Sequence, residues 1–172
     1  MRDGTPFDPV AVARVAVMVR TGLVGLQRII AWADAWVMKL DAPPLWLLEL
    51  CTVPDADRAL WLLYDMPEFP RLATVEERDV NDADHLASLF LRHRDGSISW
   101  GDFLLWAGQY LDGRSGHRQC EEFFMQLNLL ERMGFPEALV QAQREDIERS
   151  LPDALERMES VHRRFEAEAR GH

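Results

Sequence analysis

Residues 26–40 read LQRIIAWADAWVMKL and carry the clearest helical pattern in the chain. Six apolar residues in this stretch recur at the i, i+3, i+4 and i+7 spacing of one helical face: Leu26, Ile29, Ile30, Ala33, Val37 and Leu40. Trp36 widens this apolar stripe, whereas Asp34 and Lys39 fall outside it. The stretch therefore predicts an amphipathic helix over about residues 24–40 that packs one face against a core.

Helical periodicity extends over the rest of the chain and is interrupted by start and stop signals. Asp8-Pro9 is a helix-start signal, Thr74-Val75-Glu76-Glu77 is a capping box, and Pro43-Pro44 and Gly134 mark helix ends. No segment predicts a strand convincingly. We therefore predict an all-α bundle of about eight or nine helices with short loops. The helices are expected over about residues 9–20, 24–40, 45–50, 55–64, 75–93, 100–111, 117–133, 136–150 and 152–169.

Length and composition favour one globular domain. The chain has 172 residues, of which 48% are hydrophobic, and it contains six Trp and eight Phe that can anchor a core. No repeat or linker divides it, so we expect a single helical domain over residues 1–172. The helix over residues 150–172 has only a narrow apolar stripe at Leu155, Met158 and Phe165. We expect that it packs by one edge only or that it projects.

The charge of the chain excludes several classes of partner. Lys and Arg number 19 against 29 Asp and Glu, which gives a net charge of -10. This argues against binding to nucleic acid or to an anionic membrane surface, and it suits a basic protein partner or simple solubility. The chain shows neither a signal peptide nor a stretch apolar enough to span a membrane. Cys51 and Cys120 form no C-x-x-C motif, so we expect reduced thiols and a cytoplasmic protein.

Half of the net charge lies between residues 65 and 84, which carry seven acidic and two basic residues. These are Asp65, Glu68, Glu76, Glu77, Asp79, Asp82 and Asp84, against Arg71 and Arg78. Acids in the first turn of a helix complement its dipole, but Asp82 and Asp84 lie beyond that turn. The predicted partner-binding residues are Glu76, Glu77, Asp79, Asp82 and Asp84, together with Trp100. The alternative for the acidic residues is a solvated face.

Three tryptophans lie near expected helix starts or loops: Trp46, Trp61 and Trp100. An exposed Trp at such a position would be a good anchor for a protein interface. The alternative for each is packing in the core.

No catalytic or metal-binding motif stands out. The segment Asp95–Asp102 is similar to the later half of an EF-hand loop, but Leu91 and His93 would then occupy its first and third ligand positions. The five histidines form no H-x-x-x-H or H-E-x-x-H motif, and no phosphate-binding glycine loop or G-x-S-x-G is present. We therefore predict a protein that is not an enzyme, with no catalytic residue, no metal and no cofactor.

Four segments carry a resemblance to a known group of proteins. Gly22-Leu23-Val24 is followed by Ala31-Trp32-Ala33-Asp34, then by PPLWLLEL at residues 43–50 and ISWGDFLLWA at residues 98–107. This order resembles small helical bacterial proteins associated with immunity to polymorphic toxins, over about residues 15–110. The resemblance implies a helical fold and an inhibitor-type function, and it assigns no binding residues.

These observations favour a non-catalytic, protein-binding protein, specifically an immunity-type inhibitor that masks a basic toxin or enzyme with an acidic surface. The alternative is a structural or adaptor protein that self-associates through its C-terminal helix. A third reading is an enzyme or metal-binding protein whose scattered acids, histidines and cysteines converge only on folding. The partner and the oligomeric state are not evident from the sequence.

Overall fold

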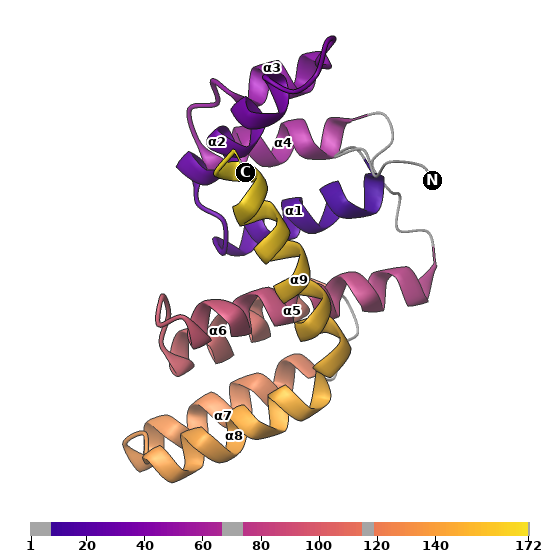
Figure 1. The fold of residues 1–172 in the computed structure, drawn as a ribbon. Coiled ribbons are helices and arrows are strands. Elements are labelled where there is room, and N and C mark those ends of the chain that lie inside the picture. The colour runs from indigo at the N-terminus through magenta and orange to yellow at the C-terminus, as the bar shows by residue number, and fades with distance from the viewer. Residues whose placement is uncertain (1–7, 67–73, 115–118, 172) are drawn as a thin grey trace. The chain divides into compact units, whose positions relative to one another are not determined.

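The computed structural model describes residues 8–66, 74–114 and 119–171, and these residues form nine α-helices with no strand among them (Figure 1). The helices are α1 (Pro9–Thr21), α2 (Leu26–Val37), α3 (Leu45–Leu50), α4 (Ala56–Asp65), α5 (Val75–Arg94), α6 (Trp100–Asp112), α7 (Gln119–Met133), α8 (Glu137–Ser150) and α9 (Pro152–Ala169). The prediction of an all-α, multi-helix fold is therefore confirmed. The single-domain organisation stays a prediction.

Local hydrogen bonds explain why the cap signals located the helix starts well. The Thr74 hydroxyl accepts from the Glu77 N–H at 3.1 Å, and the Glu77 carboxylate accepts from the Thr74 N–H at 3.0 Å. Ser99 and Asp102 form the same reciprocal box at the start of α6. Helix α4 begins at Ala56, one residue later than predicted. Asp55 is its cap, and the Asp55 side chain accepts from the Arg58 N–H at 2.8 Å.

Helix α2 ends earlier than its apolar pattern predicts. Beyond Val37, the N–H groups of Lys39 and Leu40 both donate to the Trp36 carbonyl, at 3.1 and 3.2 Å. Sharing one acceptor closes the helix in a turn before Pro43-Pro44. The apolar stripe therefore continues past the helix itself, and the Met38 side chain is left exposed.

The described chain packs as two compact units, with boundaries that fall inside α5 and α9. The first unit spans residues 1–79 and 157–172 and contains α1 to α4 and most of α9. Helix α1 packs against α4, and α2 packs against α3. The Phe165 ring of α9 stacks on the Trp32 ring of α2 with centroids 5.8 Å apart. The core of this unit includes the buried side chains of Met18, Ile29, Trp32, Leu47, Leu50, Leu63 and Phe165.

The second unit spans residues 80–156, and α6 and α7 form its most extensive pair. The Phe103 ring meets Phe90 and Phe123 edge to face, at centroid distances of 5.9 and 6.0 Å. Close packing of α7 on α6 requires a glycine at position 108. A Cβ atom there would lie only 2.8 Å from the Phe124 ring, so any side chain would force the two helices or the ring to shift.

The narrow stripe of the C-terminal helix is covered. Leu155, Met158 and Phe165 are all buried, so these side chains are not available to a second copy of the chain. This burial argues against self-association through that stripe. Within the described residues, no helix combines the length and apolar character that crossing a bilayer requires.

Candidate functional site

The acidic residues predicted to bind a partner separate into two sets along α5. Glu76, Glu77 and Asp79 are exposed on its first turns. Glu68 and Arg71, which also contribute to the charge of this stretch, lie outside the described residues. A basic partner can reach these exposed carboxylates, and their role in binding stays a prediction.

Asp82 and Asp84 are buried and do not contribute to an exposed acidic patch. Asp82 accepts a 2.6 Å hydrogen bond from the Tyr110 hydroxyl, and its carboxylate lies 3.6 Å from the Arg114 guanidinium. Further along α5, Ser88 donates to the Asp84 carbonyl at 2.9 Å. The sequence reading of a continuous acidic surface over residues 76–84 is therefore corrected. Asp82 faces inward because Tyr110 and Arg114 of the α6 region supply polar partners for its carboxylate.

Trp100 is also buried, and its environment is that of a core residue. Its ring stacks on Phe103 with centroids 4.6 Å apart, and its indole N–H donates to the Gln143 side-chain oxygen at 2.8 Å. Because its N–H is paired and both ring faces are enclosed, Trp100 cannot anchor an interface as it stands. Trp100 therefore follows the alternative considered for it, which is packing in the core.

A hollow in the first unit lies between α3 and α4. It has a volume of about 500 Å³, which falls within the range of known ligand sites. Its walls come from both helices and from the turns beside them: Pro44, Leu45, Trp46, Glu49, Arg58, Trp61, Leu62, Asp65 and Met66. We call this hollow the α3–α4 groove.

Large apolar side chains stand exposed around the α3–α4 groove. Leu45 is 70% exposed and Trp61 is 51% exposed, and Leu48 and Tyr64 are exposed nearby. Helix α3 has only six residues and buries Leu47 and Leu50 on its inner face. Its remaining leucines at 45 and 48 must therefore point outward. The short, almost wholly apolar helix thus leaves more apolar surface than the unit covers.

Charged side chains also line the groove. The Arg58 guanidinium lies 4.1 Å from the centroid of the Trp61 ring and 3.2 Å from a Glu49 carboxylate oxygen. Asp65 adds a second carboxylate to the lining, and Asp57 is exposed on the first turn of α4. The groove therefore combines an aromatic face with carboxylates, which is the environment that receives an arginine or lysine side chain.

The sequence held a signal for this groove. Residues 43–50, PPLWLLEL, and residues 60–64, LWLLY, contain more large apolar side chains than one face of a short helix can bury. Trp46 and Trp61 were candidates for exposed anchors, and the structure places Trp61 on the surface and Trp46 half-buried. Periodicity alone could not show this, because every residue of such a run reads as a potential core position.

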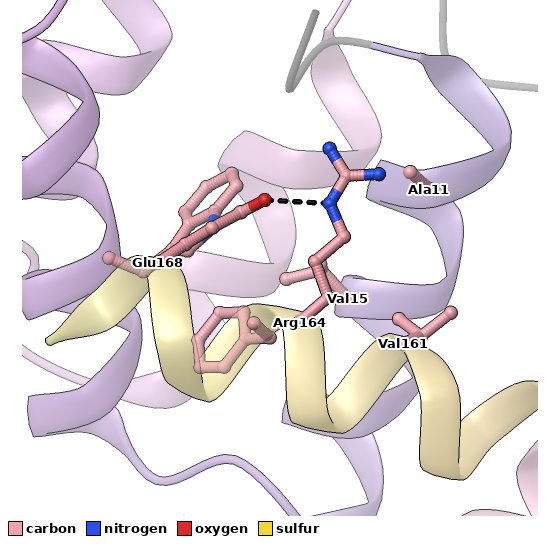
Figure 2. Close-up of a pocket in the computed structure, with 7 residues that line it drawn as sticks. Ala11, Val15, Val161, Arg164 and Glu168 are labelled. Carbon is pink, nitrogen blue, oxygen red and sulfur yellow. Dashed lines mark hydrogen bonds and ion pairs between the residues drawn. The ribbon is translucent and has the colours of Figure 1, made fainter. Parts of the chain in front are cut away.

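A second, smaller hollow lies where α9 meets α1 and α2 (Figure 2). Figure 2 shows Val161, Arg164 and Glu168 extending from α9 beside Ala11 and Val15 of α1. Its volume of about 50 Å³ is far below that of a site for an organic ligand and is enough only for water.

Glu168 ties the C-terminal helix to α2 beside this small hollow. One of its carboxylate oxygens accepts from the indole N–H groups of Trp32 and Trp36, at 2.9 and 3.2 Å. The other accepts from Arg164 at 2.7 Å. Glu166 pairs with Arg28, and this hydrogen-bonded guanidinium holds the pKa of Glu166 below its usual range. These contacts hold α9 in place and leave no reactive group free.

The Cys51 thiol and the groups of side chains that could bind a metal ion are the remaining candidates for reactive chemistry. Burial, and then the nearby Asp34, raises the pKa of Cys51 to about 11, so this thiol is protonated at neutral pH. Its Sγ donates to the Leu47 carbonyl at 3.3 Å. Among the described residues, no group of three or more His, Cys, Asp or Glu side chains is placed to hold a metal ion.

The α3–α4 groove of the first unit thus combines the volume of a ligand site with exposed apolar side chains and carboxylates in its lining. The resemblance to polymorphic-toxin immunity proteins stays a prediction. Comparison with known proteins found no family model, no curated protein and no solved structure that matches the chain.

Proposed function

We propose that this chain is a protein-binding protein and that the α3–α4 groove receives a segment of a basic protein partner. The observation that carries the proposal is the groove itself, about 500 Å³ in volume, with Leu45 70% and Trp61 51% exposed at its walls. Exposed apolar side chains gathered around a concavity are typical of interaction sites.

The aromatic side chains favour a protein over a small molecule. Trp61 is rigid and offers a large area, and Trp and Arg dominate the binding energy of protein interfaces. Leu48 is exposed on the same helix as Leu45 but does not line the groove, so it extends the apolar surface beyond the reach of a small ligand. A partner segment with apolar residues could cover both the groove and this flank.

The charges around the groove favour a basic segment. The lining of the groove contains two carboxylates, Glu49 and Asp65, and one base, Arg58. The whole chain adds a net charge of -10, which speeds the approach of a basic protein over longer distances. An arginine or lysine of the partner would lie against Trp61 and compete with Arg58 for Glu49.

The finer proposal is an immunity-type inhibitor that acts in the bacterial cytoplasm and masks a basic toxin or enzyme. What supports it is that the resemblance covers about residues 15–110 and that its segment PPLWLLEL forms one wall of the groove. In this proposal the inhibitor blocks its target by occupancy and needs no cofactor. The exposed acids Glu76, Glu77 and Asp79 would provide additional attraction.

The test uses three purified single variants: Trp61→Ala in the groove, Glu76→Lys on α5, and Met38→Glu as a matched control. Met38 is 86% exposed and does not line the groove, so its variant changes an exposed apolar residue outside the site. A partner recovered from source cells with the unmodified chain is then purified, and its affinity for each variant is measured by calorimetry.

We expect Trp61→Ala to weaken the partner's affinity by about thirtyfold, the effect of losing a binding hot spot of roughly 2 kcal/mol. Met38→Glu should bind like the unmodified chain, and Glu76→Lys should change the association rate and its salt dependence more than the affinity. Equal affinities for Trp61→Ala and the control would refute the groove. If the partner is an enzyme, an equimolar amount of this chain should abolish its activity.

A further inference from the structure

His93 lies in the last turn of α5, in the second unit, where two buried aromatic rings lie against it. The centroid of the Trp100 ring lies 5.1 Å from that of the imidazole, and the Phe90 ring meets the imidazole edge to face at 6.4 Å. Burial among apolar rings disfavours the charged form of a histidine. The fold thus holds a titratable ring in a setting that suits its neutral form.

The hydrogen bond of His93 decides which ring nitrogen carries the proton. Nδ1 lies 3.2 Å from the Ile98 carbonyl oxygen, which can only accept, so Nδ1 donates. In the neutral ring Nε2 is then an acceptor, and it is buried without a hydrogen-bond partner among the described residues. A second proton would turn Nε2 into a buried donor that has no acceptor, which is unfavourable.

The charged groups around His93 do not compensate for a positive charge on the ring. Arg144 of α8 opposes such a charge electrostatically, and Arg92 and Arg94 flank His93 on α5 itself. The α6 carboxylate of Asp102 is engaged in the capping box of its own helix. An imidazolium at position 93 would therefore face a like charge from the neighbouring helix.

The end of α5 offers an imidazolium little help. Carbonyl groups in the last turn of a helix attract a cation when they are unpaired. Here the carbonyls of Arg92 and His93 accept from the N–H groups of Ser97 and Gly96, at 2.9 and 3.0 Å. These two hydrogen bonds close the turn after α5, so the Ser97 and Gly96 amides report whether the turn is intact.

His93 also connects this turn to the start of α6. Ile98 is buried, and its carbonyl accepts from the His93 ring. The next residue, Ser99, is the cap of α6. Movement of the His93 ring would therefore release the residue before that cap, and with it the turn over residues 94–99.

We propose that His93 is an acid-sensitive latch on the turn between α5 and α6. Uptake of a proton at Nε2 moves the ring out of its buried position, which frees the Ile98 carbonyl and opens the turn. Acid thereby loosens the second unit locally, whereas the neutral ring keeps it closed. The latch does not depend on the α3–α4 groove, because every residue that carries it belongs to the second unit.

The direction of the pH dependence follows from the pKa of His93. Burial lowers this pKa below its usual range, the hydrogen bond to Ile98 opposes the shift, and Arg144 adds to it. The released ring is in water and keeps the ordinary pKa, so the open form binds its proton first as the pH falls. The latch is therefore at full strength above the ordinary histidine pKa, and it weakens as the pH falls through that value to the lowered one.

The first experiment is amide hydrogen exchange on the full chain, measured by NMR near pH 7 and at about pH 4.5 and expressed as protection factors. We expect the protection of the Gly96 and Ser97 amides to fall about fivefold or more in acid, the effect of a buried donor that has no acceptor. Ala33, which is buried in α2 of the first unit, should keep its protection. Unchanged protection at Gly96 and Ser97, or an equal loss at Ala33, would overturn the proposal.

The second experiment removes the titrating ring. In His93→Asn the side-chain amide can still donate to the Ile98 carbonyl, but it does not titrate. We therefore expect the protection of the turn to be the same at both pH values. His162→Asn is the matched control, because it removes a histidine that belongs to the first unit, and its turn should respond to acid like that of the unmodified chain. Circular dichroism establishes that each variant keeps its helix content. A His93→Asn variant whose turn still loses protection in acid would refute the latch.

Titration of the His93 ring itself needs no variant. In the unmodified chain its Cε1–H signal should titrate at a lower pH than a histidine in an unstructured peptide, because burial disfavours the charged ring. The protection of Gly96 should fall over the same pH range. A His93 ring that titrates at or above the peptide value would show that acid does not open the turn through this residue.

Discussion

An arginine, a carboxylate and an aromatic ring lie together in the α3–α4 groove and again between α5 and α6, and the first of these two settings is the more open to solvent. In the α3–α4 groove, the Arg58 guanidinium lies 3.2 Å from Glu49 and 4.1 Å from the Trp61 ring centroid. The Arg58 and Glu49 side chains are each more than 40% exposed. Water can therefore replace every polar contact in this group, and a partner can too.

The second setting is the interior of the α5–α6 pair. There Tyr110 donates to Asp82 at 2.6 Å and accepts from Arg114 at 2.9 Å and from Asn81 at 3.2 Å. The His85 ring stacks on the Tyr110 ring with centroids 3.5 Å apart. Burial, and then the hydrogen bond to Asp82, raises the pKa of Tyr110 above its usual range. Asp82 is buried and Tyr110 and Arg114 are half-buried, so water has less access here than at the groove, and the protein supplies the partners.

The difference teaches that burial, not residue type, decides whether such a group stabilises the fold or is available for binding. An exposed ion pair contributes about 0–1 kcal/mol, because water competes for both charges. A buried polar atom that loses its partner costs about 1–3 kcal/mol, because nothing replaces the lost hydrogen bond. The following variants measure that contrast, beginning with the most enclosed group.

The largest effect is expected for Tyr110→Phe. This change keeps the ring but removes the hydroxyl that donates to Asp82 and accepts from Arg114. We expect the free energy of unfolding to fall by about 1–3 kcal/mol, measured by denaturant titration. A loss below about 0.5 kcal/mol would mean that this group is not enclosed and that the contrast with the groove fails.

A smaller effect is expected at Glu168. Its carboxylate forms a partly buried group with an arginine and two tryptophans. Glu168→Ala removes the acceptor of the buried Trp32 indole N–H and should lower the free energy of unfolding by about 1–2 kcal/mol. Glu168→Gln retains an acceptor oxygen and should cost less. If both variants lost the same amount, charge rather than the indole hydrogen bonds would hold α9.

A pH dependence is expected from Glu166 and Arg28. Because Arg28 lowers the pKa of Glu166 in the folded chain, the unfolded chain binds a proton first as the pH falls. The contribution of the pair to stability is therefore complete above the ordinary glutamate pKa and is lost as the pH falls through the lowered value. Arg28→Met should reduce the free energy of unfolding at pH 7 but leave it nearly unchanged at pH 2. A difference from the unmodified chain that stays constant over that range would refute this linkage.

The smallest effect on stability is expected for Arg58→Gln in the groove. Its ion pair with Glu49 and its position over Trp61 are exposed, so the free energy of unfolding should change by less than about 0.5 kcal/mol. Affinity for a basic partner should rise, because Glu49 and Trp61 no longer have an internal occupant. A large loss of stability would show that Arg58 has a structural role instead.

Helix positions and caps could be predicted because they depend on neighbours in the sequence. The Thr74–Glu77 and Ser99–Asp102 boxes each close within four residues, and an apolar stripe shows in the spacing of the residues themselves. The candidate site could be predicted only in part. Of the three candidate tryptophans, the prediction selected Trp100 rather than Trp61, because no local feature of the sequence distinguished an exposed tryptophan from a buried one.

The amino-acid sequence by itself determined that the chain is helical, where its helices begin, and that it carries a net charge of -10. The tertiary structure decided which of its acids and tryptophans face the solvent. Trp100 is buried because Gln143, 43 residues away, accepts from its N–H, and Asp82 is buried because Tyr110, 28 residues away, donates to it. Exposure depends on what another helix brings to the same place, and the spacing within one helix carries no record of that neighbour.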